Sequence, residues 1–208
     1  MNKRLIILIL LLLFILLLII NQTNNSSEND KVLYIPNFLS DKDYQKILKL
    51  REEGDGFIFE NFRHSKPLKN QLAYDIFYNS KYINQLEVNI NKRLYPSTFP
   101  IEHRYYSQDS QGMQWHKDLL MYIKPQYEGI FTIRNNTLSR TEWKDSKGIL
   151  HSLWTEPNSL LLVRADGYEH HVTTPLKGER EILKLIYTQT DQPNQNYESE
   201  MQRFKEVY

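Results

Sequence analysis

Apolar and polar residues divide this chain into three parts. Residues 5–20 form an unbroken run of Leu, Ile and Phe, and the sequence MNKR precedes it. Residues 21–31 are polar, rich in Asn and Ser, and contain no aromatic residue. From residue 32 onward, apolar and polar positions alternate in short segments, as they do in folded domains. The pattern therefore predicts a membrane segment in residues 1–20, a flexible stem in residues 21–31 and one domain in residues 32–208.

The apolar run predicts a single transmembrane helix. At about 1.5 Å per residue this helix would be about 24 Å long, which suits a thin membrane such as that of the endoplasmic reticulum. No Ala or Gly follows the run, so an uncleaved signal anchor is favoured over a cleaved signal peptide. Lys3 and Arg4 place the N-terminus in the cytoplasm. We therefore expect a single-pass type II membrane protein whose domain lies in the lumen of the endoplasmic reticulum or Golgi, or outside the cell.

The first part of the domain, residues 32–100, has the pattern of a helical support. Ser40, with Asp43 three residues later, forms a capping box that begins a helix. The dipeptide Tyr95-Pro96 is expected to end the last helix of this part. The predicted elements are a strand over residues 32–38 and helices over residues 40–51, 70–78 and 80–94.

The second part of the domain, residues 101–190, has the pattern of a β-rich core. Short apolar runs follow one another, and Gly, Asn, Asp and Pro between them indicate turns. Short strands with regular turns predict a sandwich or barrel. We expect a mainly β fold, a double-stranded β-helix of the jelly-roll or cupin-like kind, with helices packed on one side. The predicted strands cover residues 101–107, 113–122, 130–134, 149–154, 159–163, 170–173 and 182–188.

The composition of the chain argues against several classes of function and site. The formal net charge of the 208 residues is +1, which gives no electrostatic case for binding nucleic acid. The chain has no Cys, so disulfides, zinc–thiolate sites, iron–sulfur clusters and Cys nucleophiles are excluded.

Four residues carry the candidate chemistry: His116, Asp118, His170 and Arg180. Two imidazoles and one carboxylate are the protein ligands of the facial triad that holds non-haem Fe(II). In a strand, residues i and i+2 point to one face, so His116 and Asp118 are expected to aim at one metal while Lys117 points away. The third ligand must come from another strand. A buried Arg beyond it suits the far carboxylate of a dicarboxylate cosubstrate.

The neighbourhoods of these residues carry a family resemblance. Residues 113–118 read MQWHKD, and residues 169–180 read EHHVTTPLKGER. This resembles the Fe(II)- and 2-oxoglutarate-dependent dioxygenases, especially the branch similar to prolyl 4-hydroxylase. That family carries H-x-D, a distal His and a basic residue ten positions later, often within H-x-V-x-P-x-x-x-G-x-R. The match covers about residues 102–188 and implies the jelly-roll fold. It also implies Fe(II), 2-oxoglutarate and O2 as cofactors, with ascorbate as a further candidate.

Two roles in the motif, the distal metal ligand and the partner of 2-oxoglutarate, each have a second candidate residue. His170 gives the ten-residue step to Arg180, and we favour it as the distal ligand over His171, which is expected to face outward or lie near the mouth of the site. Arg180 is the expected partner of 2-oxoglutarate. Lys184 has the same strand parity and is a second candidate, although a solvated strand charge is the better interpretation of it.

A tyrosine of the strand before the H-x-D motif is the other cofactor-binding candidate. Many members of the family place a Tyr there that hydrogen-bonds 2-oxoglutarate. Tyr106 is our choice, and Tyr105 is the alternative. Glu102, Arg104 and Tyr106 share one face, which predicts a polar wall.

Together these observations predict a membrane-anchored Fe(II)/2-oxoglutarate-dependent dioxygenase. By analogy with the prolyl 4-hydroxylases, it would hydroxylate a peptidyl prolyl or lysyl residue, or another small substrate. Two alternatives remain: a non-catalytic, membrane-tethered jelly-roll binding module, and a cupin-type metalloenzyme that does not use 2-oxoglutarate. O2-dependent release of succinate separates these hypotheses.

Overall fold

The computed structural model describes residues 9–15, 31–50, 57–60, 63–68 and 70–207, and every structural statement below refers to them. Residues 9–15 are helical and their side chains are exposed. The rest of the predicted membrane segment, and the predicted stem up to residue 30, lie outside the described residues. Within the described part of the chain, no helix is both long enough and apolar enough to cross a membrane.

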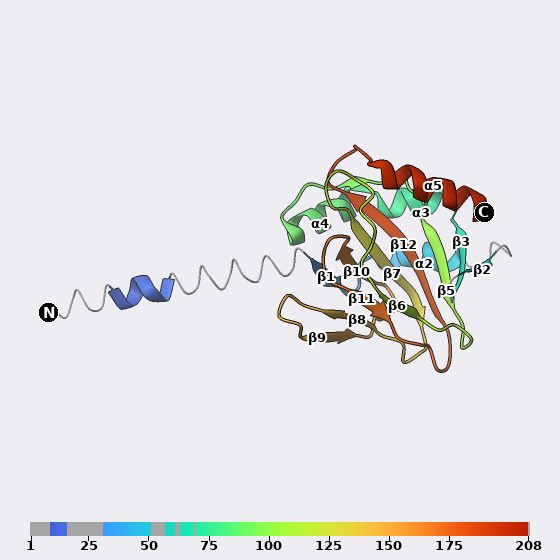
Figure 1. The fold of residues 1–208 in the computed structure, drawn as a ribbon, viewed down its shortest axis with the longest axis horizontal. Coiled ribbons are helices and arrows are strands. Elements are labelled where there is room, and N and C mark those ends of the chain that lie inside the picture. The colour runs from blue at the N-terminus through green and yellow to red at the C-terminus, as the bar shows by residue number, and fades with distance from the viewer. Residues whose placement is uncertain (1–8, 16–30, 51–56, 61–62, 69, 208) are drawn as a thin grey trace.

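Two antiparallel sheets form the body of the domain (Figure 1). The larger sheet has the strand order β1-β10-β7-β12-β5-β3-β2, with the short β4 beside β12. The smaller sheet has the order β6-β11-β8-β9. This confirms the predicted mainly β architecture. The strands of the larger sheet are β1 (Val32–Ile35), β2 (Ile58–Glu60), β3 (Arg63–Pro67), β4 (Tyr95–Pro96), β5 (Glu102–Tyr106), β7 (Tyr127–Asn135), β10 (Ser159–Arg164) and β12 (Arg180–Thr188), and those of the smaller sheet are β6 (Met113–His116), β8 (Thr141–Lys144), β9 (Leu150–Leu153) and β11 (His170–Val172).

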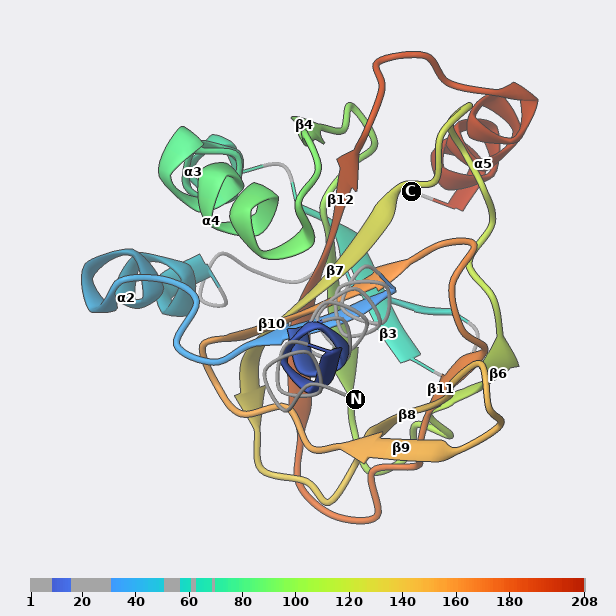
Figure 2. The same ribbon diagram turned by 90° about the vertical axis from the view of Figure 1, so that its left-hand side faces the viewer.

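Helices cover the larger sheet on the side away from the smaller one (Figure 2). They are α2 (Asp41–Lys49), α3 (Gln71–Phe77) and α4 (Ser80–Ile90). Their buried residues form one apolar core with inward-facing residues of β7, β10 and β12. The C-terminal helix α5 (Gln195–Val207) packs separately, and its Tyr197 and Phe204 form a second core with Phe99, Met121 and Ile186.

Strand β12 has two faces with different chemistry. Leu183, Leu185 and Tyr187 are buried in the core beneath the helices. Arg180 and Lys184 point to the opposite side, into a cavity between the two sheets. This follows from the alternation of side chains along a strand. The polar residues of β12 therefore stand where a ligand can reach them.

Most predicted elements are present, with shifted ends. Ser40 caps α2, and its hydroxyl oxygen accepts a hydrogen bond from the backbone N–H of Asp43 at 3.3 Å. Helix α4 ends at Ile90 because Asn91 adopts a left-handed conformation, with φ of 52°. Tyr95-Pro96 is thus not the helix stop that was expected, but a short strand paired with β12.

The strand predicted over residues 113–122 is shorter in the structure. It ends at His116, and the chain then turns across the cavity. The buried side chain of Gln126 fixes this turn, since its amide donates to the carbonyl of Leu119 at 2.7 Å and accepts from the N–H of Met121 at 3.2 Å. The alternation of apolar and polar residues does not predict where a strand ends when side-chain hydrogen bonds to the backbone decide it.

Candidate functional site

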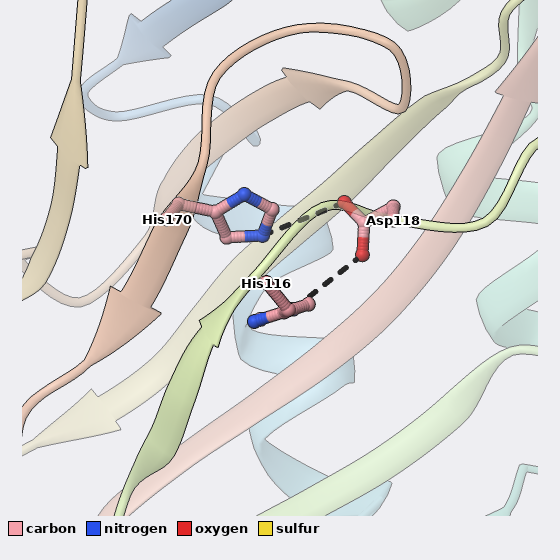
Figure 3. Close-up of side chains that lie close together, drawn as sticks. All are labelled: His116, Asp118 and His170. Carbon is pink, nitrogen blue, oxygen red and sulfur yellow. Dashed lines mark ion pairs between the residues drawn. The ribbon is translucent and has the colours of Figure 1, made fainter.

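The three predicted metal ligands come together at one end of the smaller sheet (Figure 3). His116 on β6 pairs with His170 on β11 in the strand register. Nε2 of His116 lies 3.7 Å from Oδ1 of Asp118, and Nε2 of His170 lies 3.5 Å from Oδ2. One candidate ligand atom from each side chain lies within 4.8 Å of the other two. The three residues thus form a compact two-histidine, one-carboxylate group.

Asp118 reaches this group in a different way from the one predicted. Strand β6 ends at His116, so the two-residue alternation of a strand does not extend to Asp118. The irregular segment after the strand carries this carboxylate to within reach of both imidazoles. Lys117 between them is exposed but also lines the cavity, so it does not point away from the site as predicted.

Backbone carbonyls fix the orientation of both imidazoles. Nδ1 of His116 donates to the carbonyl of Gln114 at 2.7 Å, and Nδ1 of His170 donates to that of Tyr168 at 3.1 Å. Each Nε2 is then left without a proton, as a metal ligand must be. Burial lowers the pKa of both rings, and the neighbouring His170 lowers the pKa of His116 further. Both histidines are therefore held in the neutral form that binds metal.

One oxygen of the Asp118 carboxylate, beside the two imidazoles, has no hydrogen-bond partner among the described residues. This oxygen, Oδ2, is buried. A buried carboxylate oxygen without a partner is costly, and a cation beside it removes that cost. The donor set, the tautomers and this oxygen all fit a divalent metal of the Fe(II) type.

Arg180 lies in the same cavity, which has a volume of about 220 Å³. Its side chain is only 1% exposed, and burial lowers its pKa. One nitrogen, Nη2, donates to the hydroxyls of Thr141 at 3.2 Å and Thr155 at 3.3 Å. Nε and Nη1 have no hydrogen-bond partner in the described structure. Buried N–H groups that no described residue accepts from suit this guanidinium to bind the carboxylate of a ligand.

The two tyrosine candidates point in different directions. Tyr106 is buried, lines the cavity and stands opposite Arg180 in the register of β5 and β12. Its hydroxyl lies 3.6 Å from Sδ of Met113. Tyr105 instead donates to Oε1 of Glu179 at 2.7 Å and does not line the cavity. Tyr106 is therefore the tyrosine that can contact a ligand.

His171 faces away from the metal group. Its Nε2 lies 2.8 Å from Oε2 of Glu142, and its ring stacks on Trp115 with centroids 4.1 Å apart. His171 thus packs on Glu142 and Trp115, and His170 is the histidine that groups with His116 and Asp118.

Comparison with solved structures places this geometry in a known fold. An oxidoreductase of the 2OG-Fe(II) oxygenase family from Burkholderia pseudomallei has a TM-score of 0.68 at 9% identity, over 79% of this chain and 87% of that one. A prolyl hydroxylase from Trichoplax adhaerens, solved with a peptide fragment of hypoxia inducible factor, has a TM-score of 0.59 at 17% identity, over 81% and 86%. The chain has the fold of the 2-oxoglutarate- and Fe(II)-dependent oxygenases.

A third solved structure of similar fold contains a small molecule. HygX from Streptomyces hygroscopicus, with nickel, 2-oxoglutarate and hygromycin B bound, has a TM-score of 0.60 at 11% identity, over 77% of this chain and 84% of that one. No protein-family model matches the sequence, and the curated proteins give no significant match. Structure thus relates the chain to oxygenases at identities where sequence comparison finds nothing.

The oxygenase fold of this chain also contains charged residues that the motif does not include. Nζ of Lys184 lies 2.5 Å from Oε2 of Glu128, and both line the cavity. Arg104 binds Glu102 through two hydrogen bonds of 3.0 and 3.1 Å. The polar wall predicted on β5 is therefore present. Lys184 is not the solvated charge that was expected, because its side chain is only 17% exposed. Glu128 was not identified from the sequence, and only its strand parity with Ile130 could have indicated it.

Proposed function

We propose that this chain is an Fe(II)/2-oxoglutarate-dependent dioxygenase. The observation that carries the proposal is the presence of Arg180 and the His116–Asp118–His170 group in one cavity. A metal group alone would fit several cupin-like enzymes. The buried guanidinium without an anion adds a site for a dicarboxylate beside that metal group.

Each residue has a defined part in this proposal. His116, Asp118 and His170 would hold Fe(II) and leave coordination positions for the cosubstrate and O2. Arg180 would pair the distal carboxylate of 2-oxoglutarate, and Tyr106 beside it would add a hydrogen bond. The hydroxyls of Thr141 and Thr155 hold the guanidinium in place before the ligand arrives. With Fe(II), 2-oxoglutarate and O2 bound, the site would convert 2-oxoglutarate to succinate and CO2 and hydroxylate the substrate.

Two substrate classes are compatible with this fold. The prolyl hydroxylase of Trichoplax adhaerens was solved with a peptide, which supports a peptidyl prolyl or lysyl substrate. HygX was solved with hygromycin B, which supports a small free molecule. Both inferences rest on analogy of fold.

The test of the activity is release of succinate. The purified protein, supplied with Fe(II), ascorbate and 2-oxoglutarate, is expected to release succinate only when O2 is present. Binding of 2-oxoglutarate without any turnover would favour the non-catalytic binding module. Metal-dependent turnover that needs no 2-oxoglutarate would favour another cupin-type enzyme.

We further propose that residues 1–20 anchor the domain in a membrane as a type II protein. The unbroken apolar run and Lys3 and Arg4 before it support this topology. In microsomes the domain should be protected from added protease, and the protein should resist carbonate extraction. A soluble form beginning near residue 21 would instead mean a cleaved signal peptide.

A further inference from the structure

The cavity has a second polar end, distinct from the one that contains Arg180. Five ionisable side chains from four adjacent strands line it: Arg63 from β3, Glu102 and Arg104 from β5, Glu128 from β7 and Lys184 from β12. Lys184 stands opposite Glu102 in the register of β5 and β12 and contacts Glu128 on its other side. Two carboxylates and three cations thus line the floor of the cavity.

Stability alone does not explain this arrangement. Buried ion pairs are weak stabilisers, because the cost of removing both charges from water offsets much of their attraction. The neighbouring cavity positions on the same strands, Ile130 and Ile182, are apolar. Apolar side chains at positions 128 and 184 would therefore suit the fold at least as well. Charged groups retained in a cavity next to a metal group indicate a ligand.

The Lys184–Glu128 pair lines the same cavity as His116, Asp118 and His170. A molecule bound by this pair would therefore lie beside the proposed iron. The pair is also separate from the cosubstrate end, because Arg180 is four residues away along β12.

The charges of this pair restrict the ligand that it can accept. An ammonium group can replace Lys184 as the partner of Glu128, while a carboxylate takes the spare N–H donors of Lys184. A ligand with both groups leaves no charge unpaired. A ligand with one charge leaves the opposite protein charge unbalanced in a buried site, which is costly.

Size restricts the ligand further. The cavity of about 220 Å³ is smaller than the roughly 300–1,000 Å³ typical of sites for drug-sized molecules, and the cosubstrate would take part of it. Glu200 and Arg203 of α5 pair with each other at 2.9 Å and also line the cavity. The remaining space suits a small polar molecule.

We propose that Lys184 and Glu128 recognise the head group of a small zwitterion, a free α-amino acid, as the substrate of this oxygenase. The carboxylate of the amino acid binds Lys184, and its ammonium group binds Glu128. A residue inside a peptide has neither charge on its main chain, so the pair selects the free molecule. This inference rests on the proposed function and adds the substrate class to it.

The first test compares free and blocked amino acids. Common L-amino acids, including proline and lysine, are offered to the full-length protein beside their N-acetyl forms, their amides and short peptides that contain them. Binding is measured by calorimetry, and stimulation of 2-oxoglutarate decarboxylation is measured in parallel. At least one free amino acid should bind and stimulate, and its blocked forms should bind on the order of a hundredfold more weakly. Binding of peptides but of no free amino acid overturns the proposal, as does equal binding of free and blocked forms.

The second test removes the pair as a unit. The double variant Lys184→Met/Glu128→Leu leaves neither charge of the pair behind, so it should be more stable than either single variant. It should bind 2-oxoglutarate as the wild type does and bind the amino acid on the order of a hundredfold more weakly. Lys46→Met is the control, because it breaks a 2.9 Å ion pair on α2, away from the cavity. Undiminished amino-acid binding in the double variant overturns the proposal. Failure of the wild type to bind 2-oxoglutarate would instead overturn the oxygenase function itself.

Discussion

His116 and His170 face each other across the β6–β11 pair, and their ring centroids are 4.4 Å apart. Antiparallel pairing, rather than a flexible loop, therefore sets the separation of the two imidazoles. Ligands placed on paired strands are held more accurately than ligands on loops. Only Asp118 lies beyond the strand. The side chain of Gln126 fixes the segment that follows it through two hydrogen bonds, to the backbone of Leu119 and Met121.

Replacing a metal ligand should remove metal binding without unfolding the domain. His116→Ala, Asp118→Ala and His170→Ala each delete one of three ligands, and the apolar cores lie elsewhere. Calorimetric titration with Fe(II) under nitrogen should show no binding, while thermal unfolding remains cooperative. His171→Ala is the matched control, because its ring faces Glu142. An active His170→Ala together with an inactive His171→Ala would show that the distal ligand is His171.

Arg180→Ala should weaken 2-oxoglutarate binding far more than metal binding. The variant leaves a buried carboxylate unpaired, at a cost of about 3–5 kcal/mol. The Michaelis constant for 2-oxoglutarate should rise by on the order of a hundredfold or more. Arg180→Lys should recover only part of this loss, since an ammonium group cannot reproduce the bidentate geometry. A large rise in this constant for Lys184→Met, with none for Arg180→Ala, would move the cosubstrate to the other end of the cavity.

Gly112→Ala should destabilise the protein and weaken metal binding together. Gly112 has φ of 73°, and a Cβ added there would lie 2.1 Å from the carbonyl oxygen of Val172 on β11. Relief of this clash requires β6 to move away from β11, which would separate the two histidines. We expect the free energy of unfolding to fall by more than about 2 kcal/mol.

Gly148→Ala provides the comparison for that variant. Gly148 also has positive φ, 76°, but an added Cβ would meet nothing within 4 Å. Only backbone strain remains, so the loss should be about 1 kcal/mol, with metal affinity unchanged. Equal losses in both variants, measured by urea unfolding, would show that the contact with Val172 has no effect.

The Glu102–Arg104 pair should make stability depend on acid pH. Burial alone would raise the pKa of Glu102, but Arg104, Lys184 and Arg63 outweigh it and lower the pKa from 4.5 to about 2. A carboxyl whose pKa is lower in the folded than in the unfolded protein stabilises the fold at any pH above its unfolded-state pKa. This contribution is lost as the pH falls from about 4.5 toward about 2. Glu102→Leu/Arg104→Met should lose less stability over this range when urea unfolding is followed. Identical pH dependence of variant and wild type would contradict this assignment.

The sequence predicted the site better than it predicted the chain around it. His116, Asp118, His170 and Arg180 were found because the strand order and the ten-residue step repeat a known motif. The sequence could not predict that no described carboxylate pairs with Arg180, since this depends on what β5, β7 and β8 place beside it.

Elements with weak local signals were missed. Helix α5 has only a narrow apolar stripe, Tyr197, Met201 and Phe204, and its partners Phe99 and Ile186 lie far from it in the sequence. Strand β8 is short, and it forms by pairing with β11 on one side and β9 on the other, which the local sequence does not show. The burial of Lys184 was misjudged for the same reason, because the sequence alone does not show which sheet covers a charged strand residue.

Strand β12 also fixes the distance between the two ends of the cavity. Its extended backbone sets the Cα atoms of Arg180 and Lys184 about 13 Å apart, since four residues rise about 3.3 Å each. A rigid strand cannot change this spacing when either ligand changes. Mutation of position 184 can therefore select a new substrate while the spacing to the cosubstrate remains constant. Only molecules whose reactive carbon lies at the fixed distance from their head group would be oxidised, so a homologue one methylene longer should be attacked at a different carbon.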